Sequence, residues 1–252
     1  MADQLDVLVL CTHTREFWAL DPILETEDRR VTPDFKLLLG NGAGRRWGLA
    51  KIKHVTADRT CQVIDALVHV HLPKVLVAAY YAVSLVEDVE PCWMVVADRI
   101  LRHTTQKLYE APLPPPAETQ AERVAPVLSV PQWPARPATR RKLHERTGAV
   151  VAAEDCYTFF KGVAAVRLDA AFFFVATGLD QPLGQADAAF LGPNLPFQIG
   201  ALIGALAGPG VVEELARAHK VAQELAEKFI TRLRQEAEAL LARAERAAVD
   251  SG

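Results

Sequence analysis

The sequence predicts an α/β fold that ends in a long helix. Short apolar runs rich in β-branched and aromatic residues, such as 6–11 (DVLVLC) and 171–177, are typical of buried strands. Segments of helical character lie between these runs, and the last one, 211–248, is much the longest and is amphipathic. This alternation is typical of a central sheet covered by helices.

The predicted elements follow one another along the chain without internal repeats. The predicted strands span residues 6–11, 36–40, 47–55, 74–79, 93–97, 125–130, 149–152 and 171–177. The predicted helices span residues 57–72, 138–147, 155–169 and 211–248, and residues 17–24 are helix-like.

Two glycine-rich stretches need a separate interpretation. Residues 41–44 (NGAG) lack the glycine spacing of a phosphate-binding loop, and no helix follows them, so they predict a hairpin turn. Residues 199–206 (IGALIGAL) are apolar as well as glycine-rich and predict a buried helix or close packing.

Three acidic residues follow three of the predicted strands. Glu16 lies just beyond the first strand, 6–11. The segment 149–177 predicts a strand–helix–strand unit, and such crossovers are nearly always right-handed with parallel strands. Glu154 and Asp180 follow the two strands of this unit. We therefore expect both carboxylates at the same edge of the sheet, where open α/β sheets bind their ligands.

The composition excludes several classes of function. The chain has 252 residues, enough for one large domain, and we expect residues 1–252 to form it. A net charge of −3 gives no basic surface for nucleic acid. The N-terminus lacks a signal-peptide pattern, and no uncharged apolar run reaches the roughly 20 residues of a membrane span. We expect a cytoplasmic protein with no membrane partner.

The sequence contains no pattern of metal ligands. Its four cysteines lie far apart without CxxC spacing, which is typical of thiols in a reducing compartment. His69 and His71 have no acid or cysteine at ligand spacing. We therefore expect neither a metal nor another cofactor.

The segment 89–105 (VEPCWMVVADRILRHTT) resembles a strand and loop of the purine nucleoside phosphorylase/nucleosidase superfamily. The order of the predicted strands resembles that superfamily too, over roughly residues 5–181, and most of all its hydrolytic branch of methylthioadenosine/adenosylhomocysteine nucleosidases and futalosine hydrolases. The resemblance implies a three-layer fold with a mixed central sheet flanked by helices. It also implies a nucleoside-like small-molecule substrate and a homo-oligomer, either a dimer or a hexamer.

The resemblance implies a role for each residue that falls on a family motif. Glu16 in THTREF falls where the hydrolytic branch has the Glu that activates water. Trp133 falls where an aromatic side chain stacks on the base. Glu154 in VVAAED matches the Glu that binds the sugar hydroxyls, and Ala153 replaces the Met beside it. Asp180 falls at the Asp that donates a proton to the leaving base.

The sequence also departs from the family pattern. Residues 80–84 (YYAVS) replace the family's Gly-Ser-Ala-Gly-Gly, and side chains there narrow or reshape the pocket. Tyr80 and Tyr81 either fill that space or stack on a planar ring. His103 is a candidate for binding an anion or a substrate tail. Residues 11–16 (CTHTRE) contain no glycine-rich phosphate loop, which favours hydrolysis over phosphorolysis.

The chemistry of N-glycosidic cleavage suits these residues. A departing base needs a general acid, here Asp180, and water needs a general base, here Glu16. Each residue also has a purely structural interpretation: Glu154 suits the first turn of a helix, Asp180 suits a turn, Glu16 suits a solvated helix start, and Trp133 suits a packed rim. Three acids at the ends of three strands together favour a site.

The sequence thus predicts a hydrolase of purine-type nucleosides, and it leaves two alternatives open. One is a member of the same fold that acts on a non-nucleoside small molecule in a biosynthetic pathway, since fold does not fix function. The other is a non-catalytic ligand-binding homologue that uses its long C-terminal helix for interactions.

Overall fold

The computed structural model describes residues 4–53, 56–105, 107–114, 120–181 and 209–250, except for the side chains of residues 209–219. The described helices are α1 (Thr14–Leu20), the 3-10 helix η1 (Asp21–Ile23), α2 (Ala57–His71), α3 (Pro137–Thr147), α4 (Cys156–Val163) and α7 (Pro209–Asp250). The described strands are β1 (Val7–Cys11), β2 (Glu25–Val31), β3 (Phe35–Gly42), β4 (Arg45–Ile52), β5 (Val75–Ser84), β6 (Met94–His103), β7 (Leu108–Pro112), β8 (Arg123–Val130), β9 (Val151–Glu154) and β10 (Ala170–Thr177).

The described strands form one mixed sheet in the order β10-β6-β8-β9-β5-β1-β4-β3-β2, with β7 paired to β6. β5 is parallel to β1 and to β10, whereas β10 is antiparallel to β6. Because β10 pairs with β5 as well as with β6, the strands β5, β10, β6, β8 and β9 close into a ring. The mixed sheet that the sequence predicts is confirmed.

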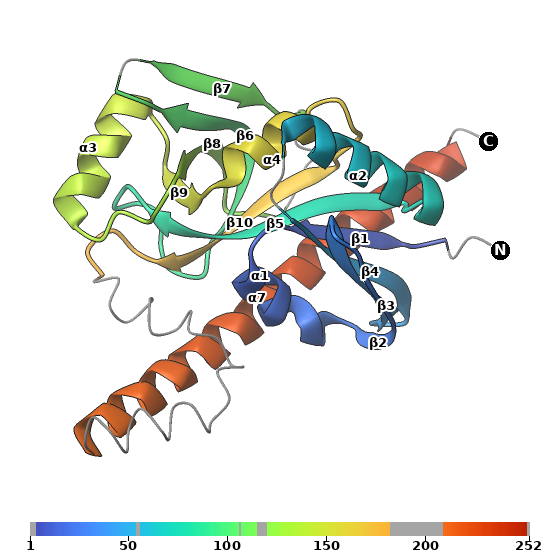
Figure 1. Cartoon of the computed structure of the whole chain (residues 1–252), viewed down its shortest axis with the longest axis horizontal. Helices are drawn as coiled ribbons and strands as arrows, with labels where there is room; N and C mark the ends of the chain where they lie inside the picture. Colours follow the sequence, from blue (N-terminus) through green and yellow to red (C-terminus); the bar gives the residue numbers. More distant parts are fainter. Residues whose placement is uncertain (1–3, 54–55, 106, 115–119, 182–208, 251–252) are drawn as a thin grey trace.

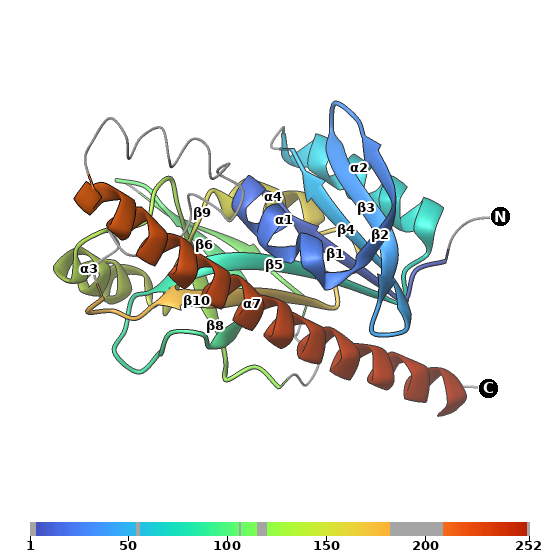
Figure 2. The ribbon, with the colours of Figure 1, turned by 90° about the horizontal axis from the view of Figure 1, so that it is seen from below.

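Helices cover both faces of the sheet, as the sequence predicts (Figure 1). α2 and α4 lie together on one face, and α7 runs across the other, beside α1 and along β5 (Figure 2). Each face has its own apolar core. Adjacent residues of β5 point into different cores, because side chains alternate along a strand. Tyr80 packs on the α2–α4 side, whereas Tyr81 packs on the α7 side against Phe229.

Local sequence signals account for several element boundaries. The Thr56 side chain accepts a hydrogen bond from the backbone of Arg59 and so caps α2. Pro137 begins α3, and Gly148, with a φ of 70°, ends it in the left-handed conformation that glycine favours. Ala43 and Gly44, with φ of 50° and 75°, form the turn between β3 and β4, which confirms the hairpin.

The parallel arrangement predicted for β9 and β10 is wrong. Val83 of β5 pairs with Ala152 of β9 on one side and with Thr177 of β10 on the other. β10 runs parallel to β5 and β9 runs antiparallel to it, so β9 and β10 run in opposite directions. The crossover rule concerns parallel strands of one sheet, whereas α4 joins strands on opposite edges of β5 within a closed ring. Glu154 and Asp180 therefore leave the sheet in opposite directions.

Other element boundaries differ from the prediction in length. The helix predicted for 155–169 ends at Val163, and the strand predicted for 74–79 continues to Ser84. α7 spans the long C-terminal helix predicted for 211–248. The prediction for 199–206 lies outside the described residues. None of the described helices combines the length and apolar composition that a bilayer crossing requires.

Candidate active site

The first turn of α1 places a buried acid against the middle of β5. β1 runs directly into α1, so Arg15 and Glu16 follow the end of a fully buried strand. Glu16 is 0% exposed. Its Oε1 accepts a hydrogen bond from the backbone N–H of Tyr81 (3.2 Å) and another from Nε of Arg15 (2.9 Å). Glu16 is therefore fixed inside the protein rather than solvated at a helix start.

Glu154 ends β9 and faces the same arginine. Its Oε2 accepts a hydrogen bond from Nη1 of Arg15 at 2.6 Å. Its Oε1 accepts another from the backbone N–H of Trp133 at 3.1 Å, and Nε2 of His13 donates to its backbone carbonyl at 2.9 Å. Segments far apart in the sequence thus meet at one carboxylate.

Trp133 completes the arrangement with an aromatic face. Cζ of Arg15 lies 4.2 Å from the centroid of the Trp133 ring, well within cation–π distance. Trp133 is 6% exposed. One guanidinium therefore contacts both carboxylates and the indole. We call Arg15, Glu16, Trp133 and Glu154 the Arg15 cluster.

The electrostatics of the cluster hold Arg15 in its charged form. Burial alone would lower the pKa of Arg15, but the charges of Glu16 and Glu154 and their hydrogen bonds raise it overall. Arg15 was not singled out in the sequence, and its position next to Glu16 was the one signal that could have indicated it.

Asp180 lies apart from this cluster. Its side chain is 70% exposed, and its Oδ1 accepts a hydrogen bond from Nη2 of Arg141 at 2.8 Å. The same guanidinium nitrogen donates to Glu87 at 3.1 Å. Among the residues that the structure describes, Asp180 has no hydrogen bond or ion pair with Glu16 or Glu154.

A buried arginine holds the chain that leads to Asp180. Arg140 of α3 is 0% exposed. Its Nε donates to the Pro134 carbonyl (2.8 Å), and its Nη1 donates to the carbonyls of Gly178 (2.8 Å) and Leu179 (3.2 Å). Burial lowers the pKa of Arg140, and the charge of Asp180 partly offsets this effect. Nothing in the basic sequence of α3 distinguishes this arginine from its exposed neighbours.

The remaining predicted residues have mainly protein contacts. Tyr80 is 0% exposed and stacks on Phe173 at 5.4 Å between ring centroids. Tyr81 packs against Phe229 at 4.6 Å, on the same side of the sheet as Trp133. Ala153 is fully buried in the α2–α4 core. Both tyrosine rings thus fill space within the protein.

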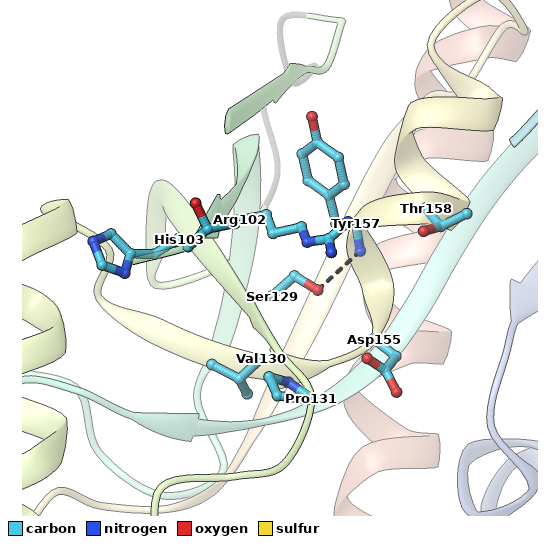
Figure 3. A pocket seen from close by; sticks show the side chains of 9 residues that line it. Arg102, His103, Ser129, Val130, Pro131, Asp155, Tyr157 and Thr158 are labelled. Carbon is cyan, nitrogen blue, oxygen red and sulfur yellow. Dashed lines mark hydrogen bonds between the residues drawn. The ribbon is translucent and has the colours of Figure 1, made fainter. Parts of the chain in front are cut away.

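His103 lines a cavity of about 500 Å³ beyond the end of β8 (Figure 3). The lining residues come from β6, β8 and the start of α4: Arg102, His103, Thr104, Ser129, Val130, Pro131, Asp155, Tyr157 and Thr158. Oγ of Ser129 accepts a hydrogen bond from the backbone N–H of Tyr157 at 3.0 Å, which fixes the first turn of α4 there. The lining includes neither Glu154 nor Trp133, but it includes Asp155, which follows Glu154, and Val130, which pairs with Glu154.

Within the described part of the chain, no group of three or more His, Cys, Asp or Glu side chains could hold a metal ion. The Arg15 cluster itself brings together two carboxylates, a guanidinium and an indole ring.

Comparisons with known proteins identify the fold. No family model and no curated protein matches the sequence. The structure is similar to 5′-methylthioadenosine/S-adenosyl homocysteine nucleosidase of Helicobacter pylori, with a TM-score of 0.55 and 9% identity over 89% of this chain and 99% of that one. It is equally similar to futalosine hydrolase of the same organism, with a TM-score of 0.55 and 9% identity over 90% and 98% of the two chains.

A third similar structure is the 5′-methylthioadenosine/S-adenosylhomocysteine nucleosidase of S. pneumoniae, with a TM-score of 0.52 and 11% identity over 90% of this chain and 99% of that one. The chain thus shares the nucleoside phosphorylase-like fold of these proteins, as the sequence predicts. At 9–11% identity, the likeness concerns the fold, and function has to be argued from the site.

Proposed function

We propose that this protein is an N-glycosyl hydrolase that acts on a purine-type nucleoside. The observation that carries the proposal is the meeting of two carboxylates and an indole around one guanidinium, with Glu16 wholly buried. Proteins seldom bury a carboxylate unless it is paired or has a functional role. The similar structures are two nucleosidases and a futalosine hydrolase, which adds support at the level of the fold.

Each residue has one chemical task in the proposed reaction. Trp133 stacks on the base, and Glu154 accepts hydrogen bonds from the sugar hydroxyls. Glu16 takes the proton of the attacking water, and Asp180 protonates the departing base. Asp180 first has to leave Arg141, and an exposed ion pair of this kind is worth only about 0–1 kcal/mol.

Hydrolysis is proposed rather than phosphorolysis. β1 passes into α1 through Thr12 and His13, without a glycine-rich loop that could surround a phosphate. Water is therefore the proposed nucleophile, and release of the base should not depend on added phosphate.

The test is a screen of the purified full chain against adenosine, methylthioadenosine, adenosylhomocysteine, inosine and futalosine, with and without phosphate. Free base is measured by chromatography. We expect release without phosphate, and losses of at least about 100-fold in kcat for Glu16→Gln and Asp180→Asn. Glu87→Gln is the matched control, because Glu87 also pairs with Arg141 and is 73% exposed. No release from any nucleoside by the folded protein would refute the proposal.

One observation favours a second candidate function. Arg15 is bonded to both carboxylates of the cluster, so it engages the oxygens that would otherwise serve water and sugar. A protein that binds a small molecule without cleaving it, or one that acts on a non-nucleoside, is consistent with this pairing. Equilibrium binding of a nucleoside without turnover in the same screen would support this candidate.

A further inference from the structure

We propose that Arg15 occupies the ligand position of the Arg15 cluster in the free protein and that a ligand binds by displacing it. The inference rests on the proposed function for the location of the site. It adds the step that opens the site: the guanidinium of Arg15 leaves its partners when a ligand binds.

The guanidinium makes the contacts that the proposed ligand needs. It lies 4.2 Å from the centroid of the Trp133 ring, where a base would stack. Its Nη1 is bonded to Oε2 of Glu154, the oxygen available for a sugar hydroxyl, at 2.6 Å. Its Nε is bonded to Oε1 of Glu16, the proposed general base, at 2.9 Å. A nucleoside and the Arg15 side chain therefore cannot both make these contacts.

Arg15 and Glu154 reach solvent, whereas Glu16 does not. The side chains of Arg15 and Glu154 are 15% and 21% exposed, whereas that of Glu16 is 0% exposed. Within the described residues, Oε2 of Glu16 is buried without a hydrogen-bond partner. An unpaired buried carboxylate oxygen is costly, so it marks a place where a water or a ligand would bind favourably. We infer that the route to this atom leads past Arg15.

Charge determines what can replace Arg15. Once Arg15 leaves, two carboxylates face the site without their cation, and a buried anion is stable only with a partner. A cationic ligand supplies that partner directly. A neutral nucleoside supplies it only as positive charge develops on the sugar during cleavage, so the site would bind the transition state better than the substrate.

The first test uses Arg15→Ala and methylguanidinium chloride as the probe, with thermal unfolding and calorimetry as readouts. We expect saturable stabilisation of this variant, and affinity at least about tenfold higher than for the wild type or for Arg15→Ala/Glu154→Gln. Arg59→Ala is the matched control, because it removes an exposed arginine that pairs with Asp34 elsewhere. Arg15→Gln replaces the alanine variant if the latter does not fold. Equal weak binding to all variants would overturn the proposal.

The second test measures a cationic hydroxypyrrolidine that carries a purine-like ring. We expect it to bind Arg15→Ala at least about tenfold more tightly than the wild type, because the variant has no side chain to displace. Equal or weaker binding to the variant would overturn the proposal. If methylguanidinium binds the variant but no nucleoside is cleaved and the pyrrolidine binds neither protein, the cation site stands and the proposed nucleosidase function fails.

Discussion

Substitution of Arg140 by Met tests how the end of β10 is held in place. Arg140 is wholly buried and donates to the carbonyls of Pro134, Gly178 and Leu179. Met keeps much of the side-chain volume but has no donor, so all three acceptors lose this charged partner. Pro134 lies just before α3, and Gly178 and Leu179 lie just before Asp180.

The size of the effect follows from two opposing terms. A hydrogen bond to a charged group contributes about 1.5–3 kcal/mol, so removing three of them should lower the free energy of unfolding considerably. Removing a buried guanidinium also removes its desolvation penalty, which amounts to several kcal/mol. We therefore expect Arg140→Met to lower the free energy of unfolding by about 2–4 kcal/mol, near the cost of breaking a buried polar network.

Urea unfolding of the full chain measures this difference. Arg141→Met is the control, because Arg141 is the next residue of the same helix but its two ion-pair partners are exposed. Its expected cost is about 0–1 kcal/mol. If Arg140→Met were no less stable than Arg141→Met, the three carbonyl contacts would not hold the end of β10.

Three further substitutions test the packing of the helices and one buried acid. Phe229→Ala should cost about 3–5 kcal/mol in urea unfolding, because this ring is fully buried between α7 and the sheet. Gly162→Ala should cost about 1–3 kcal/mol, because a Cβ there would lie 2.5 Å from the Ala57 carbonyl of α2. Burial raises the pKa of Glu236 above 4.5, although the Gln120 N–H partly offsets this. The folded state thus binds the proton of the Glu236 carboxyl more tightly than the unfolded state does, and stability is lost as pH rises through the raised pKa. Glu236→Gln should therefore be more stable than the wild type at pH 8 and equal to it below about pH 4.

Burial decides how much of the fold the sequence predicts. β10, a strand of the ring, is buried at every position and apolar at all but Thr177, and its sequence pattern predicts it. β2 (ETEDRRV) is almost wholly exposed, so no apolar pattern marks it, and only its pairing with β3 makes it a strand. The directions of β9 and β10 depend on the closure of the ring, which is a property of long-range pairing rather than of any segment.

The candidate site divides in the same way. Glu16 and Glu154 each follow a buried strand, and that pattern is enough to place both near the end of the sheet. The contact of Glu16 and Glu154 with Arg15 could not be predicted in this way. It depends on the side-chain conformation of Arg15, which belongs to no sequence pattern of its own. Asp180 likewise bonds to Arg141 of α3, a contact that no sequence pattern indicates.

The two ion-pair systems differ in what it takes to open them. Asp180 and Arg141 are 70% and 44% exposed, so salt screens their attraction over a Debye length of about 8 Å at physiological ionic strength. Arg15 and Glu16 are 15% and 0% exposed, so salt screens them much less. If access to the site requires release of Arg15, raising the salt concentration from 50 mM to 500 mM should change the apparent affinity for a cationic ligand by no more than about twofold. This limit does not include the general screening of the ligand's own approach to the inner carboxylates. A steep fall in this affinity with salt that Arg59→Ala also shows and Arg141→Met does not would instead place the controlling ion pair at Asp180. That result would contradict the role of Arg15.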